Sequence, residues 1–148
     1  ITHLRIGESL LLGTNTQNGE PLKGFRQDTV ALYANLIELK EKPSLPIGET
    51  GLNAFGERVQ FEDRGTMLRG ILALGRQDVS IEDLTPLDDR VKILGASSDH
   101  LLVDLSLVPK SRLSDSLGFS LNYSGVLRLS TSKYVKKESE IIENVSIF

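Results

Sequence analysis

Short apolar segments, each followed within a few residues by glycine or proline, constrain the fold of this chain more than any other feature. Such segments are typical of an antiparallel sheet that curls into a barrel. Long helical segments do not alternate with them, so the chain is not a complete doubly wound or eight-fold α/β fold. We therefore expect a mainly β domain, built as a partly open, Greek-key-like barrel.

Residues 29–40 form the longest predicted strand. One face carries Val30, Leu32, Ala34 and Leu36, and the other carries Ala31, Tyr33 and Ile37. Both faces are apolar at first, as in a sheet covered on both sides. A helix is the alternative, because Ala, Leu, Glu and Lys all favour helices. Other segments are predicted as a strand with its turn (1–13), a loop (14–27), further strands (66–75, 91–94, 101–105, 117–123 and 126–135) and a polar connector (78–90).

The composition excludes several classes of function. The net charge is −3, from 17 basic and 20 acidic residues, so no basic field would attract nucleic acid. The absence of cysteine excludes disulfides and thiolate nucleophiles, and fits a reducing compartment. The two histidines, His3 and His100, have no carboxylate at ligand spacing, so we expect no metal site. No apolar run approaches the roughly 18 residues of a membrane span, and we expect a cytoplasmic protein.

A glycine follows the first predicted strand, in the segment Arg5-Ile6-Gly7-Glu8. Without a β-carbon, Gly7 lets a ligand approach the backbone closely, and the exposed N–H groups of such a turn can hold a phosphate. In α/β barrels the turns after the last two strands are a common phosphate site. The alternative is an ordinary strand end with a surface arginine.

Two further segments carry chemically useful side chains. Arg76 follows a strongly apolar strand within Gly75-Arg76-Gln77-Asp78, where a guanidinium can bind a carboxylate through two hydrogen bonds, or form a surface pair with Asp78. Residues 97–100 read Ser-Ser-Asp-His, which suggests a nucleophile, a base and an orienting group. Adjacent strand residues point to opposite faces, however, so we favour a bend in which Ser97 and Asp99 bond local N–H groups.

Five stretches, taken in order, resemble the carboxyl-terminal part of the alanine/ornithine racemase-like enzymes, a fold type III family that depends on pyridoxal phosphate. They are residues 4–8 (LRIGE), 48–56 (GETGLNAFG), 75–78 (GRQD), 94–100 (LGASSDH) and 121–123 (LNY). The resemblance implies a barrel of eight α/β units that carries the cofactor lysine, followed by a β domain. Residues 1–27 would then be the last strand and linker of a truncated α/β barrel, and residues 28–148 the C-terminal β domain. The start at Ile1 fits an amino end cut from a longer protein.

The resemblance also implies roles for individual residues. Arg5 matches the arginine that hydrogen-bonds the pyridine nitrogen of pyridoxal phosphate; a guanidinium donates no proton to the ring, which favours racemisation over competing reactions. Gly7 and Glu8 match positions whose N–H groups hold the phosphate. Tyr123 matches a tyrosine near the phosphate, and Asp99 matches an aspartate in a loop that the partner subunit of a head-to-tail homodimer supplies.

One position departs from the family pattern. Phe55 stands where the alanine racemases have the tyrosine that serves as the second acid/base, and phenylalanine transfers no proton. His100 is our first candidate for this role, because an imidazole titrates near neutrality. Asp99 is the second candidate and Ser98 the third.

The resemblance therefore implies a domain of a racemase that removes the Cα proton of a free amino acid and returns it on the opposite face. The chain alone, without the cofactor lysine, is expected to be inactive. Two alternatives stay open: a β-barrel dimerisation or binding module without catalysis, and another reaction of the same cofactor, such as decarboxylation.

Overall fold

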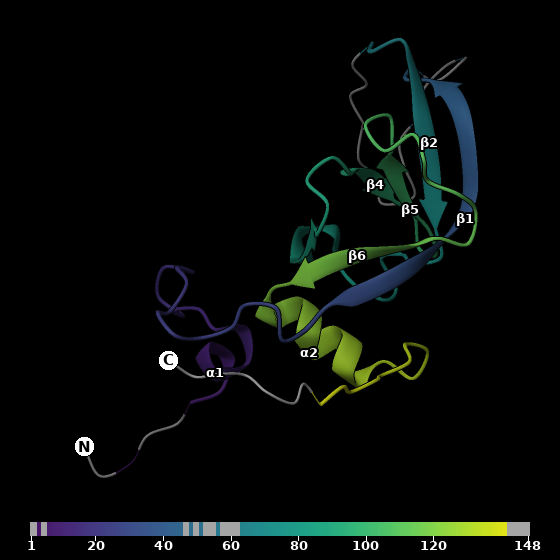
Figure 1. Cartoon of the computed structure of the whole chain (residues 1–148). Helices are drawn as coiled ribbons and strands as arrows, with labels where there is room; N and C mark the ends of the chain where they lie inside the picture. The colour runs from purple at the N-terminus through teal and green to yellow at the C-terminus, as the bar shows by residue number, and fades with distance from the viewer. Residues whose placement is uncertain are drawn as a thin grey trace.

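The computed structural model describes residues 3, 6–45, 48, 51, 56 and 63–141, and its main element is a six-stranded antiparallel sheet (Figure 1). The strand order is β3-β6-β1-β2-β5-β4. Such a non-sequential order is typical of Greek-key-like connections. The strands are β1 (Leu32–Pro43), β2 (Thr66–Leu72), β3 (Leu84–Pro86), β4 (Lys92–Ala96), β5 (Leu101–Asp104) and β6 (Ser116–Leu121).

The sheet curls into a partly open barrel, as predicted. Strands β3 and β4 are its two edges, yet residues 87–91 alone connect them along the chain. The edges of a flat six-stranded sheet lie about 24 Å apart, whereas a connector of this length spans at most about 22 Å. The sheet must therefore bend until its edges approach each other, and the 3-10 turn η1 (Ile81–Asp83), just before β3, does contact β4.

Strand β1 joins the two halves of the sheet, which confirms the predicted strand over the helix. Its first residues pair with β6, and from Leu36 onward it pairs with β2. A register irregularity between Leu36 and Glu38 marks the change of partner and lets the strand bend. Leu32, Ala34 and Leu36 face the core as predicted, but Tyr33 is 65% exposed and Ile37 is 50% exposed. Within this chain, therefore, the second apolar face of the strand is not covered.

The core lies inside the curve of the sheet. Its largest fully buried side chains come from β1, β2, β5, β6 and the residue directly after β5, and are Phe119, Leu36, Leu72, Leu101, Val103 and Leu105. Helix α2 (Tyr123–Thr131) closes one side, where Leu129 is buried against the same cluster (Figure 1).

The prediction of a strand over residues 126–135 is wrong, because helix α2 occupies most of this segment. Asn122 begins the helix: its side-chain oxygen accepts a hydrogen bond from the N–H of Gly125 at 2.9 Å. The same side chain donates to the buried carboxylate of Asp83 at 2.8 Å. One amide thus caps the helix and ties it to η1.

The segment 78–90 is more than the predicted polar connector. It contains η1 and the edge strand β3, and its side chains at Val79, Asp83 and Leu84 are buried. The predicted strands over residues 66–75, 91–94, 101–105 and 117–123 are confirmed with small changes at their ends. Strand β2 stops at Leu72, which leaves Gly75 and Arg76 in the turn that follows.

Candidate functional site

Two turns that are distant in the sequence lie against each other and form what we call the two-turn corner, residues 75–78 and 97–100. The N–H of Arg76 donates to the carbonyl of Ser97 at 2.9 Å, and the N–H of Gln77 donates to the carbonyl of Ser98 at 3.0 Å. Two candidate segments that were proposed separately from the sequence are therefore parts of one structure.

Gly75 makes this close approach possible. A β-carbon at this position would lie 2.1 Å from the carbonyl oxygen of Ser98 and 2.4 Å from the amide nitrogen of Asp99. Both atoms belong to the backbone and cannot swing aside. The N–H of Gly75 also donates to the carboxylate of Asp78 at 3.2 Å, which fixes the turn from within. A glycine directly after an apolar strand was the sequence signal for this contact, and it was interpreted only as part of the Arg76 motif.

The second turn is closed by Ser97, as the favoured bend predicted. The hydroxyl of Ser97 accepts the N–H of His100 at 3.1 Å, and the N–H of Ser97 donates to the carbonyl of His100 at 2.9 Å. Ser97 therefore bonds the main chain of His100 and not its ring, which is not the geometry of a nucleophile and its base. Asp99 does not bond a local N–H; instead its carboxylate accepts the hydroxyl of Ser98 at 2.8 Å.

Two polar side chains of the corner, Asp99 and His100, are exposed, and that of Arg76 is half-buried. The corner therefore displays a carboxylate and an imidazole at the surface, next to the turn that carries a guanidinium. This set of groups suits an amino acid better than it suits a metal ion, and the described part of the chain holds no cluster of three or more potential metal ligands.

The predicted phosphate-binding residues lie elsewhere. The predicted buried strand over residues 1–13 is wrong for Glu8–Leu12, which form the short helix α1 with no buried residue. Gly7 precedes this helix and is not part of it. Gly7 and Glu8 line a surface hollow of about 330 Å³, together with Thr16, Leu22 and Phe25 from the following loop. Arg5 and Phe55 lie outside the described residues.

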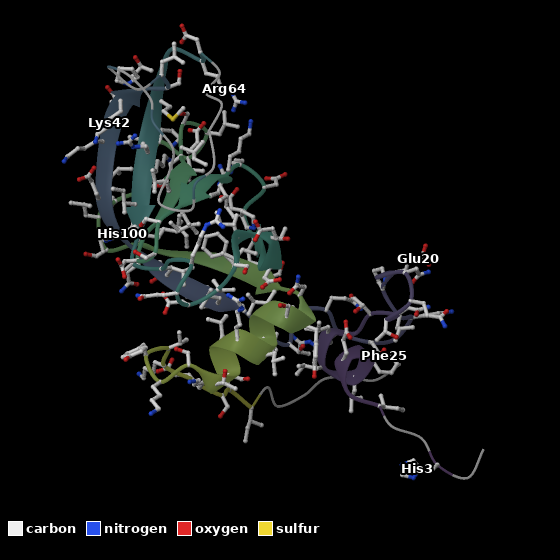
Figure 2. All side chains as sticks on the ribbon, turned by 180° about the vertical axis from the view of Figure 1, so that it is seen from behind. His3, Glu20, Phe25, Lys42, Arg64 and His100 are labelled. Carbon is white, nitrogen blue, oxygen red and sulfur yellow. The ribbon has the colours of Figure 1, made fainter. Side chains whose placement is uncertain are left out.

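Tyr123 is not part of this hollow. It is the first residue of α2 and its side chain is 45% exposed. The hollow and the corner also lie apart: Figure 2 shows Phe25, which marks the hollow, and His100, which marks the corner, on opposite sides of the molecule. In one chain, Gly7 and Glu8 of the hollow are therefore not brought together with Asp99 and His100 of the corner.

A membrane-crossing helix is absent from the part of the chain that the structure covers, where no helix is both long and apolar enough.

The hydrogen bond between Asn122 and the buried Asp83 was not predicted from the sequence. The available signal was Asn122 itself, because Asn directly before a segment with periodic apolar residues is a helix-start signal.

Comparison with known proteins gives clear relatives. The chain is 50% identical over 139 residues to an ornithine racemase of Acetoanaerobium sticklandii, covering 93% of this chain and 39% of that protein. It is 41% identical over 140 residues to a lysine racemase of Thermotoga maritima, covering 95% of this chain and 40% of that protein. Among solved structures, it is similar to the biosynthetic alanine racemase of Pseudomonas aeruginosa, with 21% identity, a TM-score of 0.42, and coverage of 78% of this chain and 32% of that one.

No protein-family model matches the chain. The two sequence relatives nevertheless align with almost all of it, and at high identity. Over this length, the chain is similar in sequence to the ornithine and lysine racemases, and it spans about two fifths of the length of these curated relatives.

Proposed function

We propose that this chain is the carboxyl-terminal β domain of a pyridoxal-phosphate-dependent racemase that acts on amino acids with a second, terminal amino group. The observation that carries the proposal is the 50% and 41% identity to an ornithine racemase and a lysine racemase. Ornithine and lysine share an α-carboxylate, an α-amino group and a distal ammonium, so we extend this substrate class to the present chain.

The residues at the amino end fit the anionic end of pyridoxal phosphate. No atom lies within 4 Å of the position that a β-carbon would take at Gly7, so a ligand has room to approach the backbone there. The N–H groups of Glu8 and Ser9 begin helix α1 and have no acceptor within it. We assign the phosphate to these main-chain groups and, by resemblance, the pyridine nitrogen to Arg5 and a contact near the phosphate to Tyr123.

When bound, pyridoxal phosphate would draw electron density from the Cα of the amino acid and make its proton acidic. The side chains of this domain would then position the substrate and move the proton. In this proposal Arg76 binds the α-carboxylate. His100 exchanges the proton on one face of Cα, and a lysine outside this chain exchanges it on the other face. Asp99 is the second candidate for the role of His100.

The separation of the hollow from the corner supports a homodimer. Because Phe25 and His100 lie on opposite sides of the molecule in Figure 2, one small substrate cannot contact both places in a single chain. Two copies that dock head to tail would place the corner of one beside the hollow of the other. Each complete site would then need both copies, as in a closed two-fold assembly.

The first experiment measures proton exchange and inversion separately, in the full-length protein with pyridoxal phosphate. Each enantiomer of ornithine and lysine is incubated in D₂O, and deuterium at Cα and the enantiomer ratio are followed. Wild-type protein should give both exchange and inversion. His100→Gln should still exchange the Cα proton of one enantiomer, through the remaining base, but should invert it far more slowly. Release of CO₂ without inversion would indicate a decarboxylase instead, and absence of both reactions would indicate a binding module.

The second experiment tests whether two copies share a site. Arg5→Leu and His100→Gln are each expected to be inactive, because each removes one half of the machinery. Random mixing of the two should restore up to about a quarter of the wild-type activity, since half of the dimers would be mixed and each would hold one intact site. If the mixture stays as inactive as its components while mixed dimers are detected, the shared site is ruled out.

A further inference from the structure

We propose that the carboxylate of Asp99 binds the terminal ammonium of the substrate and so selects amino acids that carry a second amino group. This inference rests on the function proposed above and names the residue responsible for the choice of substrate. In this role Asp99 determines specificity and does not move the Cα proton.

The backbone at Asp99 is held in a fixed place. Two hydrogen bonds, of 2.9 and 3.0 Å, join its turn to the turn of Arg76, and a β-carbon at Gly75 would lie 2.4 Å from the Asp99 amide nitrogen. Ser97 closes the turn through its contacts with His100. The Asp99 side chain therefore leaves from a fixed point, and its carboxylate can reach only the few places that its rotamers allow.

The Asp99 carboxylate itself has capacity to spare. It accepts a hydrogen bond from the Ser98 hydroxyl at 2.8 Å, and no lysine or arginine of the described residues forms an ion pair with it. Two carboxylic acids in neighbouring segments instead accept main-chain N–H groups of their own turns. Asp78 accepts the N–H of Gly75, and Asp104 accepts the N–H and hydroxyl of Ser106. A carboxylate has about four acceptor positions, so Asp99 retains several for a cation.

The charges of the corner match those of the substrate class. Arg76, assigned to the α-carboxylate, and Asp99 leave adjacent backbones, because the N–H of Arg76 donates to Ser97, two residues before Asp99. A diamino acid carries the complementary pair, a carboxylate at one end and an ammonium at the other. Because the Asp99 side chain is exposed, it can change rotamer, which allows substrates that differ by one methylene, such as ornithine and lysine.

The test compares substrates with and without the terminal amino group in the full-length protein. Norvaline and norleucine have the carbon chains of ornithine and lysine but end in a methyl group. Wild-type protein should prefer ornithine over norvaline in kcat/KM. Asp99→Asn should reduce this preference on the order of tenfold or more, mainly through a higher KM for ornithine, because a charge-assisted hydrogen bond is lost. Asp99→Glu should keep the preference for a terminal ammonium but favour ornithine over lysine, because its longer arm suits the shorter substrate.

Asp89→Asn is the matched control, since Asp89 is an exposed acid on the connector 87–91 and its loss changes the net charge equally. It should leave the ornithine preference as in wild type. The inference is overturned if Asp99→Asn keeps the preference, or if it lowers kcat equally for all four substrates, which would indicate an acid/base role. Failure of the proposed function is a separate result: the wild-type protein would then invert none of the four.

Discussion

The carbonyl oxygen of Ser98 faces Gly75 so closely that a β-carbon at residue 75 would lie 2.1 Å from it. A carbon and an oxygen atom that share no bond cannot lie this close, so any other residue at position 75 must push the two turns apart. The candidate site therefore depends on the absence of a side chain, in addition to the side chains that it displays.

Gly75→Ala should lower the free energy of unfolding by about 1–3 kcal/mol, because the backbone must shift to make room. Denaturant unfolding measures this change. Gly95→Ala is the control: Gly95 lies in β4, and a β-carbon there would meet nothing within 4 Å. The control should change stability by less than about 1 kcal/mol. Equal effects of the two substitutions would contradict the close approach at Gly75.

Two glycines in the sheet should respond differently to the same substitution. A β-carbon at Gly70 would lie 2.7 Å from Leu36, which is 1% exposed, whereas one at Gly118 would lie 2.7 Å from Leu87, which is 55% exposed. Leu87 can change rotamer and Leu36 cannot. Gly70→Ala should therefore cost about 1–3 kcal/mol of stability and Gly118→Ala much less, as measured by thermal unfolding. A larger loss of stability for Gly118→Ala than for Gly70→Ala would contradict this explanation.

Asn122→Ala removes the cap of helix α2 and the amide donor of the buried Asp83 carboxylate. Loss of a cap costs about 1 kcal/mol, and an unsatisfied buried acceptor costs about 1–3 kcal/mol more. We expect a total of about 2–4 kcal/mol, with faster amide exchange throughout α2 measured by mass spectrometry. Asn18→Ala, which removes an exposed amide bonded only to Glu20, should leave exchange in α2 unchanged.

Asp88, on the connector between the edge strands, should titrate at unusually low pH. The hydrogen bonds from the Arg90 side chain lower the pKa of its carboxyl from 3.8 to about 2, with a further contribution from the Arg90 N–H. Since this pKa is lower in the folded than in the unfolded state, the interaction stabilises the fold above about pH 4 and is lost as the pH falls towards 2. A pH titration followed by carbon NMR of the Asp88 carboxyl group measures this pKa directly.

Arg90→Ala should move the pKa of Asp88 back towards 3.8, though not fully, because the N–H of residue 90 still donates at 3.0 Å. Lys92→Ala removes a nearby cation that forms no bond to Asp88, and should leave the titration of Asp88 unchanged. If both substitutions raise the pKa of Asp88 equally, the nearby positive charge and not the Arg90 hydrogen bonds would set this pKa.

The sheet was predictable because its information is local. The alternation of Leu32, Ala34 and Leu36 marks β1, and glycine or proline marks the ends of the other strands. Helix α2 was only partly predictable: Asn122 is a local helix-start signal, whereas its bond to Asp83, 39 residues away in the sequence, is not visible in any local pattern. The meeting of Arg76 with Ser97 was likewise beyond prediction, because it depends on how the barrel closes and not on any local pattern.

The two edge strands of the barrel, β3 and β4, limit how copies of the chain can associate. Strand β3 has only 3 residues and ends at Pro86, which lacks an N–H, and β4 has a register irregularity between Ile93 and Gly95. Unpaired strands invite other chains to add to a sheet, but short, proline-ended or bulged strands offer a poor template. The opening of this barrel should therefore resist amyloid-like stacking, and any association between copies should proceed through side chains and not through shared backbone ladders.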